Sequence, residues 1–177
     1  VLNFVGCVER PWEEESWTSR KPWRELSADY EGWHPMVRAP IEAADKDQCF
    51  RWALNNRKPV MNWCTDRVAL LGDSVHATLP YMAQGAAMAI EDAAILSRAL
   101  LLDAPLQDRL KVYEQHRAPR AARVVNESTE MGELYHIADA ADMKQAFKDR
   151  NIAASRNNWL YPYHPWTVDI ERPFEGV

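Results

Sequence analysis

The most informative part of the chain is the segment RVALLGDSVHATLP, residues 67–80, which leads through residues 81–85 into an apolar run over residues 86–102. The continuous apolar residues 68–71 predict a strand buried on both faces, because a strand covered on both sides needs no polar alternation. Asp73 follows at the end of that strand, and a loop then leads to a helix whose first N–H groups have no intrahelical acceptor. This order predicts a site for a polyhydroxylated, partly anionic ligand.

Composition narrows the class of protein. The 177 residues are 47% hydrophobic, which is enough for a core of ordinary size. A net charge of −5 argues against nucleic acid as a partner, since such proteins usually carry a basic patch. Cys7, Cys49 and Cys64 show no C-x-x-C spacing, so neither a disulfide framework nor a metal site is predicted, and a reducing, cytoplasmic setting is expected. Charged residues interrupt the longest apolar run, so no membrane span is expected.

The first part of the chain predicts strands and short helices. Residues 1–8 have strand character from the first residue, without an initiator Met, so we expect the C-terminal part of a longer protein. Prolines at 22 and 35 predict two short helices, to about Tyr30 and Ala44, because the proline ring pre-sets helical φ at a helix start. Residues 48–54 are a weaker candidate for a second strand.

The second part predicts helices and a packed tail. Helices are expected over residues 85–103, 106–136 and 139–151, the second broken or bent near Pro119, where the ring removes one hydrogen bond. Polar residues on the first of these helices, Glu91 and Asp92 among them, predict a solvated stripe. The tail is too rich in proline for a helix and too aromatic for a free linker, so it is expected to pack down as an extended strap over 159–166.

Three features of the central segment carry a binding prediction. The Asp73 carboxylate can accept hydrogen bonds from ligand hydroxyls. Small side chains over residues 84–87 let a ligand approach the free N–H groups at the helix start, where the partial positive charge favours an anionic ligand edge. Pro80 stiffens the loop between them and presents a wall without an N–H group.

These same residues resemble a known family, the single-component flavin monooxygenases that hydroxylate aromatic rings, and within it the salicylate hydroxylase and 6-hydroxynicotinate monooxygenase group. The likeness rests on GDSVHATLP at 72–80, QG at 84–85, ED at 91–92, NFVG at 3–6, YE at 113–114, RAPR at 117–120 and WLY at 159–161. It covers nearly the whole chain. The family's second FAD fingerprint has this Gly-Asp to Gln-Gly spacing.

The resemblance implies roles for individual residues. Gly72 and Asp73 would contact FAD, with Asp73 on the ribityl chain, and Pro80 would line the reactive face of the flavin. Gln84 would also contact FAD, and the amides of Gly85, Ala86 and Ala87 would contact the pyrimidine end of the flavin. His76 matches the family's loop histidine and, with Pro80, is the candidate catalytic residue, either near the substrate or supporting the loop.

The family's chemistry follows from the same resemblance. FAD is reduced by NAD(P)H, reacts with O₂ to give a C4a-hydroperoxide, and passes one oxygen atom to an electron-rich ring, here that of a small aromatic acid such as salicylate. A dry site protects that chemistry, and Leu79, Met82 and Ala83 could supply its apolar wall. No metal is implied, and the oligomeric state stays open.

The implied fold class is α+β. Residues 1–62 would be a remnant of a substrate-binding, antiparallel sheet domain, residues 63–103 the second FAD-contacting strand, loop and helix, and residues 104–177 C-terminal helices and an aromatic tail. The six glycines form no G-x-G-x-x-G loop, so the family's N-terminal Rossmann-like βαβ unit is absent from this sequence. We therefore expect weak FAD binding and no turnover from these residues alone.

Other interpretations stay open. Gly72-Asp73-Ser74 also resembles the nucleophile block of GDS-type esterases, in which Ser74 would need a remote acid and histidine. A third possibility is a truncated, inactive remnant that serves as an interaction module. His76 could be an ordinary hydrogen-bonded loop histidine, Asp73 a cap, and the aromatic residues plain packing. For Glu91 and Asp92, the alternative to a solvated stripe is a role in holding the flavin loop.

Overall fold

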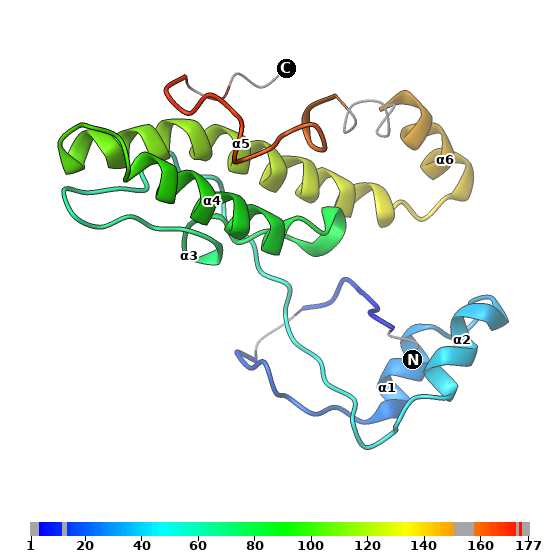
Figure 1. The fold of residues 1–177 in the computed structure, drawn as a ribbon. Helices are drawn as coiled ribbons and strands as arrows, with labels where there is room; N and C mark the ends of the chain where they lie inside the picture. The colour runs from blue at the N-terminus through cyan, green and yellow to red at the C-terminus, as the bar shows by residue number, and fades with distance from the viewer. Residues whose placement is uncertain (1–3, 12–13, 151–157, 173, 175–177) are drawn as a thin grey trace. The chain divides into compact units, whose positions relative to one another are not determined.

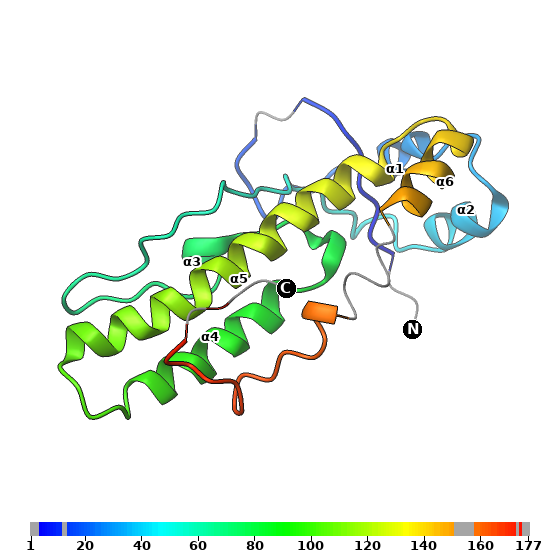
Figure 2. The same cartoon turned by 90° about the horizontal axis from the view of Figure 1, so that it is seen from above.

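The computed structural model describes residues 4–11, 14–150, 158–172 and 174, and it divides the chain into two compact units, Val1–Leu54 and Asn55–Val177. Helices account for most of the regular structure in both units (Figures 1 and 2). In the part of the chain that is described, every helix is too short or too polar to span a membrane.

The first unit contains two short helices, α1 (Trp23–Asp29) and α2 (Pro35–Glu42). Pro22 immediately precedes α1, and a second proline is the first residue of α2, positions where a fixed φ favours a helix start. The indole Nε1 of Trp23 donates a hydrogen bond of 2.8 Å to the carbonyl of Ile41, which ties one helix to the other. Both short helices predicted from the sequence are confirmed.

Strand pairing in the first unit is limited, among its described residues, to one isolated antiparallel bridge between Arg20 and Phe50. Residues 4–8 and the rest of residues 48–54 have no regular structure, and residues 1–3 lie outside the described residues. The antiparallel substrate-domain sheet therefore stays a prediction.

The second unit is built around a long helical hairpin. Its elements are α3 (Asp73–His76), the 3₁₀ turn η1 (Pro80–Met82), α4 (Gly85–Ala99), α5 (Leu106–Tyr135) and α6 (Ala140–Asp149). Figures 1 and 2 show α4 and α5 side by side and running in opposite directions, with α6 following the end of α5. The three helices predicted here are confirmed, although α4 ends at Ala99, before a turn that was expected to be helical.

No break occurs at Pro119, because α5 is one continuous helix across it. Ala118 and Ala121 on either side of the proline are 1% and 0% exposed. Their packing in the core holds the helix together where the ring removes one backbone donor. The predicted break is therefore wrong, and the alternative, a bend at this position, stays a prediction.

The segment 68–71, before α3, forms a single β-bridge and not a buried strand. Cys64 and Ala69 form an isolated antiparallel bridge. Three of the apolar side chains are exposed: Val68 57%, Leu70 38% and Leu71 40%. Burial on both faces is therefore a wrong prediction for this segment, since Ala69 packs against the core whereas these three side chains stay exposed.

The core of the second unit lies between α4 and α5 and is closed by the tail. Its buried apolar side chains include Trp63, Val75, Met88, Ile95, Tyr113, Val124, Met131, Trp159 and Leu160. Burying a large apolar side chain stabilises a fold by about 1.5–3 kcal/mol. On the tail, Arg98 donates to the carbonyls of Pro165 at 2.5 Å and Val168 at 2.7 Å. The tail thus packs down as predicted, through turns more than as an extended strap.

Candidate functional site

The Gly-Asp loop is shaped by its backbone and anchored from behind. Gly72 has φ of +61°, a conformation that L-residues with side chains rarely adopt. Its buried N–H donates to Oδ2 of Asp92 on α4 at 2.9 Å. Asp73 follows as the first residue of α3, and its side chain is exposed. The loop therefore presents the Asp73 carboxylate to solvent from a fixed backbone.

The Pro80 loop is fixed to α5. Pro80 begins η1 and is exposed. The preceding carbonyl, that of Leu79, accepts a 2.6 Å hydrogen bond from the hydroxyl of Ser128, which is fully buried on α5. Ala83 closes the turn with φ of +53°, an uncommon value for a residue with a Cβ. The proline is therefore exposed on a loop that is hydrogen-bonded to α5, and its role as a wall of the site stays a prediction.

Three backbone donors are free where α4 begins. The N–H groups of Gly85, Ala86 and Ala87 have no acceptor among the described residues, whereas the next amide, that of Met88, donates to the Gln84 carbonyl at 2.8 Å. Such groups and the helix dipole together favour an anionic or carbonyl-rich ligand. A Cβ added to Gly85 would meet, among the described residues, the Thr78 methyl group at 3.7 Å, which is an ordinary van der Waals contact.

His76 lies behind the loop rather than on its surface. The ring is 2% exposed and its centroid is 5.3 Å from that of Trp63. Its Nε2 is 2.6 Å from Oδ2 of Asp92, and its Nδ1 is buried without a hydrogen-bond partner among the described residues. A carboxylate on one side requires a donor, so Nε2 is assigned a proton and donates to Asp92. Of the two roles proposed from the sequence, this position favours support of the loop.

Ser74 does not form a nucleophile–histidine pair. Its hydroxyl donates to the carbonyl of Leu71 at 2.7 Å, whereas the His76 ring is hydrogen-bonded to Asp92. A serine hydrolase would need its hydroxyl bonded to a base. The geometry gives the esterase interpretation no support.

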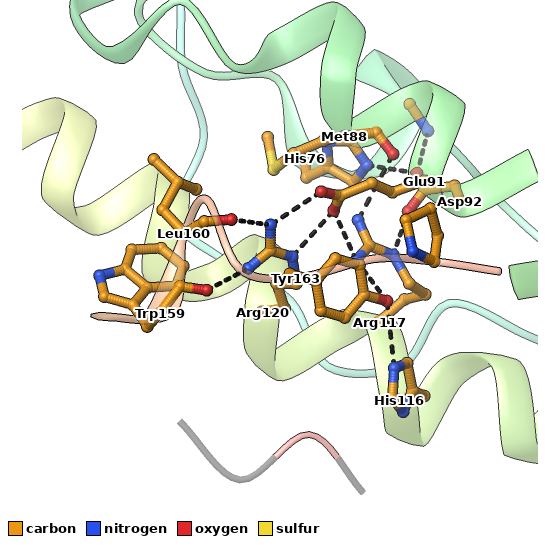
Figure 3. A network of polar contacts seen from close by, with 12 residues as sticks. His76, Met88, Glu91, Asp92, His116, Arg117, Arg120, Trp159, Leu160 and Tyr163 are labelled. Carbon is orange, nitrogen blue, oxygen red and sulfur yellow. Dashed lines mark hydrogen bonds and ion pairs between the residues drawn. The ribbon is translucent and has the colours of Figure 1, made fainter. Parts of the chain in front are cut away.

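Asp92 joins the loop to α5. Its side chain is 0% exposed, and beyond Gly72 and His76 it accepts a 2.8 Å hydrogen bond at Oδ1 from Nε of Arg117, which is also fully buried. Figure 3 shows these groups converging from α3, α4 and α5. Burial alone would raise the pKa of Asp92, but the hydrogen bonds from His76 and Gly72 and the charge of Arg117 together lower this pKa below its ordinary value.

Glu91 and Arg120 extend the network to the tail. Arg120 donates through Nε and Nη2 to the two carboxylate oxygens of Glu91, at 2.8 and 2.7 Å. It also donates to the carbonyls of Trp159 at 3.2 Å and Leu160 at 3.1 Å, as Figure 3 shows. Arg117 makes a second ion pair to Glu91 at 2.8 Å. The predicted solvated stripe is therefore wrong for Glu91 and Asp92, which are enclosed by two arginines of α5.

Sequence reasoning missed the site role of these arginines. Arg117 and Arg120 were quoted only as part of a resemblance, and their spacing puts both on one face of α5. Two acids on an otherwise apolar helix, matched by two arginines on the next helix, are a signal that could have revealed the pairing.

Comparison with known proteins places this geometry in a family. The sequence matches the FAD binding domain family over residues 3–128. A 6-hydroxynicotinate 3-monooxygenase of Bordetella bronchiseptica is 44% identical over 70% of this chain and 32% of its own length. A salicylate hydroxylase of Pseudomonas putida is 32% identical over 97% of this chain and 40% of its own.

Two solved structures are also similar to this chain. Klebsiella pneumoniae HpxO complexed with FAD and uric acid superposes with a TM-score of 0.64 and 28% identity, covering 75% of this chain and 35% of that one. A salicylate hydroxylase substrate complex gives 0.64 and 28%, covering 89% of this chain and 40% of that one. The chain thus spans between 32% and 40% of the length of these four proteins. By its sequence match and its loop and helix geometry, the chain belongs to the FAD binding domain family, alongside the FAD-dependent aromatic hydroxylases.

Proposed function

We propose that this chain carries the flavin-side part of the FAD site in a monooxygenase that hydroxylates a small aromatic acid, with NAD(P)H as reductant and O₂ as co-substrate. The observation that carries this proposal is the exposed Asp73 carboxylate on a loop anchored to α4, the same helix whose first three N–H groups are free. The names of the related hydroxylases support the reaction class.

The residues present fit the cofactor group by group. The ribityl chain of FAD offers hydroxyl donors, and Asp73 offers an accessible acceptor. The pyrimidine end of the flavin is rich in carbonyl oxygens and gains negative charge on reduction, which suits the free donors at Gly85, Ala86 and Ala87 and the helix dipole. Pro80 offers a rigid wall without a donor to compete for the ring.

Each protein group then has a definite task. The Asp73 carboxylate would hold the ribityl hydroxyls, and the positive φ of Gly72 lets the backbone turn so that this carboxylate stays exposed. Gln84 holds the turn before α4, since its side-chain amide donates to the Met82 carbonyl at 3.4 Å. When bound, FAD supplies the redox chemistry by which one oxygen atom of O₂ enters the aromatic ring and the other leaves as water.

The wider architecture is part of the same proposal. We expect the first unit to contribute to an antiparallel substrate-domain sheet in the α+β fold of the family. Substrate class, the choice of NADH or NADPH, and catalysis by the whole protein belong to the proposal as well.

Asp73→Ala tests the assignment in the complete polypeptide encoded by the gene. The ratio of bound flavin to protein, read from flavin absorbance after gel filtration, should fall by about tenfold, as expected for losing a charged hydrogen-bond acceptor. Asp108→Ala is the matched control, because Asp108 is also an exposed acid in the first turn of a helix. Unchanged flavin occupancy in Asp73→Ala would contradict the proposed site, and wild-type protein that never binds flavin would favour the inactive-remnant alternative.

A further inference from the structure

One buried carboxylate holds both ends of the short helix that carries Asp73. Oδ2 of Asp92 accepts the Gly72 N–H at 2.9 Å, immediately before Asp73, and contacts Nε2 of His76 at 2.6 Å, three residues after it. Oδ1 takes the Arg117 Nε at 2.8 Å. All three donors lie on the inner side of the loop, whereas the Asp73 side chain is exposed.

The charges around Asp92 balance without help from His76. Glu91 and Asp92 carry two negative charges, and Arg117 and Arg120 carry two positive charges, each arginine paired to Glu91. His76 completes the set as a hydrogen-bond donor from Nε2 to Asp92. Such a buried set is weak evidence for stability, because apolar residues of similar volume often stabilise a core as well or better. Its geometry therefore points to orientation of the loop.

We propose that Asp92 is a positioning residue: through Gly72 and His76 it sets the direction in which Asp73 faces the flavin ribityl chain, with His76 serving as a hydrogen-bond donor to Asp92 and not as a proton-transferring group. The identity of the ligand rests on the proposed function above. The positioning itself rests on the hydrogen bonds at Asp92.

The unpartnered Nδ1 of His76 allows a positioning role to be distinguished from proton transfer. Glutamine can place its side-chain amide nitrogen where Nε2 lies and keep the bond to Asp92, and it gives up only an Nδ1 that has no partner. Asparagine is shorter and places its amide near Nδ1, out of reach of the carboxylate. If His76 acts by positioning the loop, Gln at this position should therefore preserve its function and Asn should not. If His76 transfers a proton, neither substitution should preserve its function.

The test compares three variants in the complete polypeptide. His76→Gln should bind FAD within about threefold of wild type with the same flavin absorbance spectrum, because the donor is kept. His76→Asn and Asp92→Asn should weaken FAD binding by about tenfold or more and change the bound-flavin spectrum. Turnover should follow the same order, with His76→Gln retaining the wild-type pH profile.

A second readout needs no cofactor. Amide hydrogen exchange at Gly72, followed by NMR, should be slow in wild type and His76→Gln and should speed up in Asp92→Asn, because the acceptor of that N–H has been weakened. Lys111→Met on the exposed face of α5 should leave both readouts unchanged.

The outcomes separate the two proposals. Wild-type protein without flavin would overturn the proposed function, while Gly72 exchange would still report on Asp92. Wild-type affinity and spectrum in Asp92→Asn, or equal loss of binding and turnover in His76→Gln and His76→Asn, would overturn the positioning role. If Asp92→Asn does not fold, the Gln and Asn pair at position 76 decides.

Discussion

Replacing Arg117 with methionine should cost the second unit a large part of its stability. The guanidinium makes 2.8 Å contacts to Asp92 and to Glu91, and longer ones to the Tyr163 hydroxyl at 3.3 Å and the Met88 carbonyl at 3.4 Å. Methionine fills the volume of the aliphatic stem but leaves one buried negative charge without compensation. Breaking a buried ion pair from one side costs about 3–5 kcal/mol, against about 5–15 kcal/mol for a whole domain.

The measurement is urea unfolding followed by tryptophan fluorescence, since Trp63 and Trp159 are 3% and 4% exposed in this core. Lys111→Met on the same helix is the control and should change stability by less than about 0.5 kcal/mol, because Lys111 is solvent-exposed. The double variant Arg117→Met with Asp92→Leu should be less destabilised than the sum of the singles by about 2 kcal/mol. A loss below about 1 kcal/mol for Arg117→Met, or no coupling in the double variant, would refute the reasoning.

Three further predictions follow from the packing of the second unit. Gly132→Ala should destabilise it by about 1–2 kcal/mol in urea unfolding, because the new Cβ would lie 2.6 Å from the ring of Tyr81, a clash larger than the gain in helix propensity; equal or higher stability would contradict this packing. Ser128→Ala should cost about 1 kcal/mol in the same assay by removing the shorter hydrogen bond to the Leu79 carbonyl, which then keeps only the 3.4 Å contact from the Thr78 hydroxyl, and an unchanged midpoint would show that the bond from Ser128 is unimportant. Burial, then the charges of neighbouring arginines, lower the pKa of His116 despite its bond to the Arg172 carbonyl, so its contribution to stability is complete above about pH 6.5 and is lost as pH falls toward the folded pKa. The urea midpoint should thus drop between pH 7 and pH 5.5, and less so in His116→Gln; a midpoint that rises on acidification would reverse the sign.

Local signals were enough to predict α1, α2, α4, α5 and α6, whereas the single turn α3 and the 3₁₀ turn η1 lie in a segment that was predicted as a loop. Prolines at helix starts located α1 and α2, and runs of Ala, Leu, Ile and Met located α4. These preferences act within a few residues, so they can be recognised without the fold. The Pro80 loop and the free N–H groups of Gly85, Ala86 and Ala87 were also predictable, because a helix start always leaves such donors.

Burial could not be predicted in the same way. The segment 68–71 was expected to be covered because it is apolar, yet covering depends on neighbours that the pattern does not specify. Glu91 and Asp92 were expected to be solvated because isolated acids rarely lie in a core. Their partners, Arg117 and Arg120, lie on α5, and the sequence of α4 alone does not indicate them.

The continuity of the polar network indicates a stiff support rather than a switch. From the tail, Arg120 connects the Leu160 carbonyl to Glu91, Arg117 connects Glu91 to Asp92, and Asp92 reaches the loop that bears Asp73. A switch needs a second arrangement of similar energy. Moving any one of these charged side chains would leave a buried charge without its partner, which costs several kcal/mol. The loop is therefore expected to hold one orientation before any ligand arrives, which reduces the ordering cost of binding.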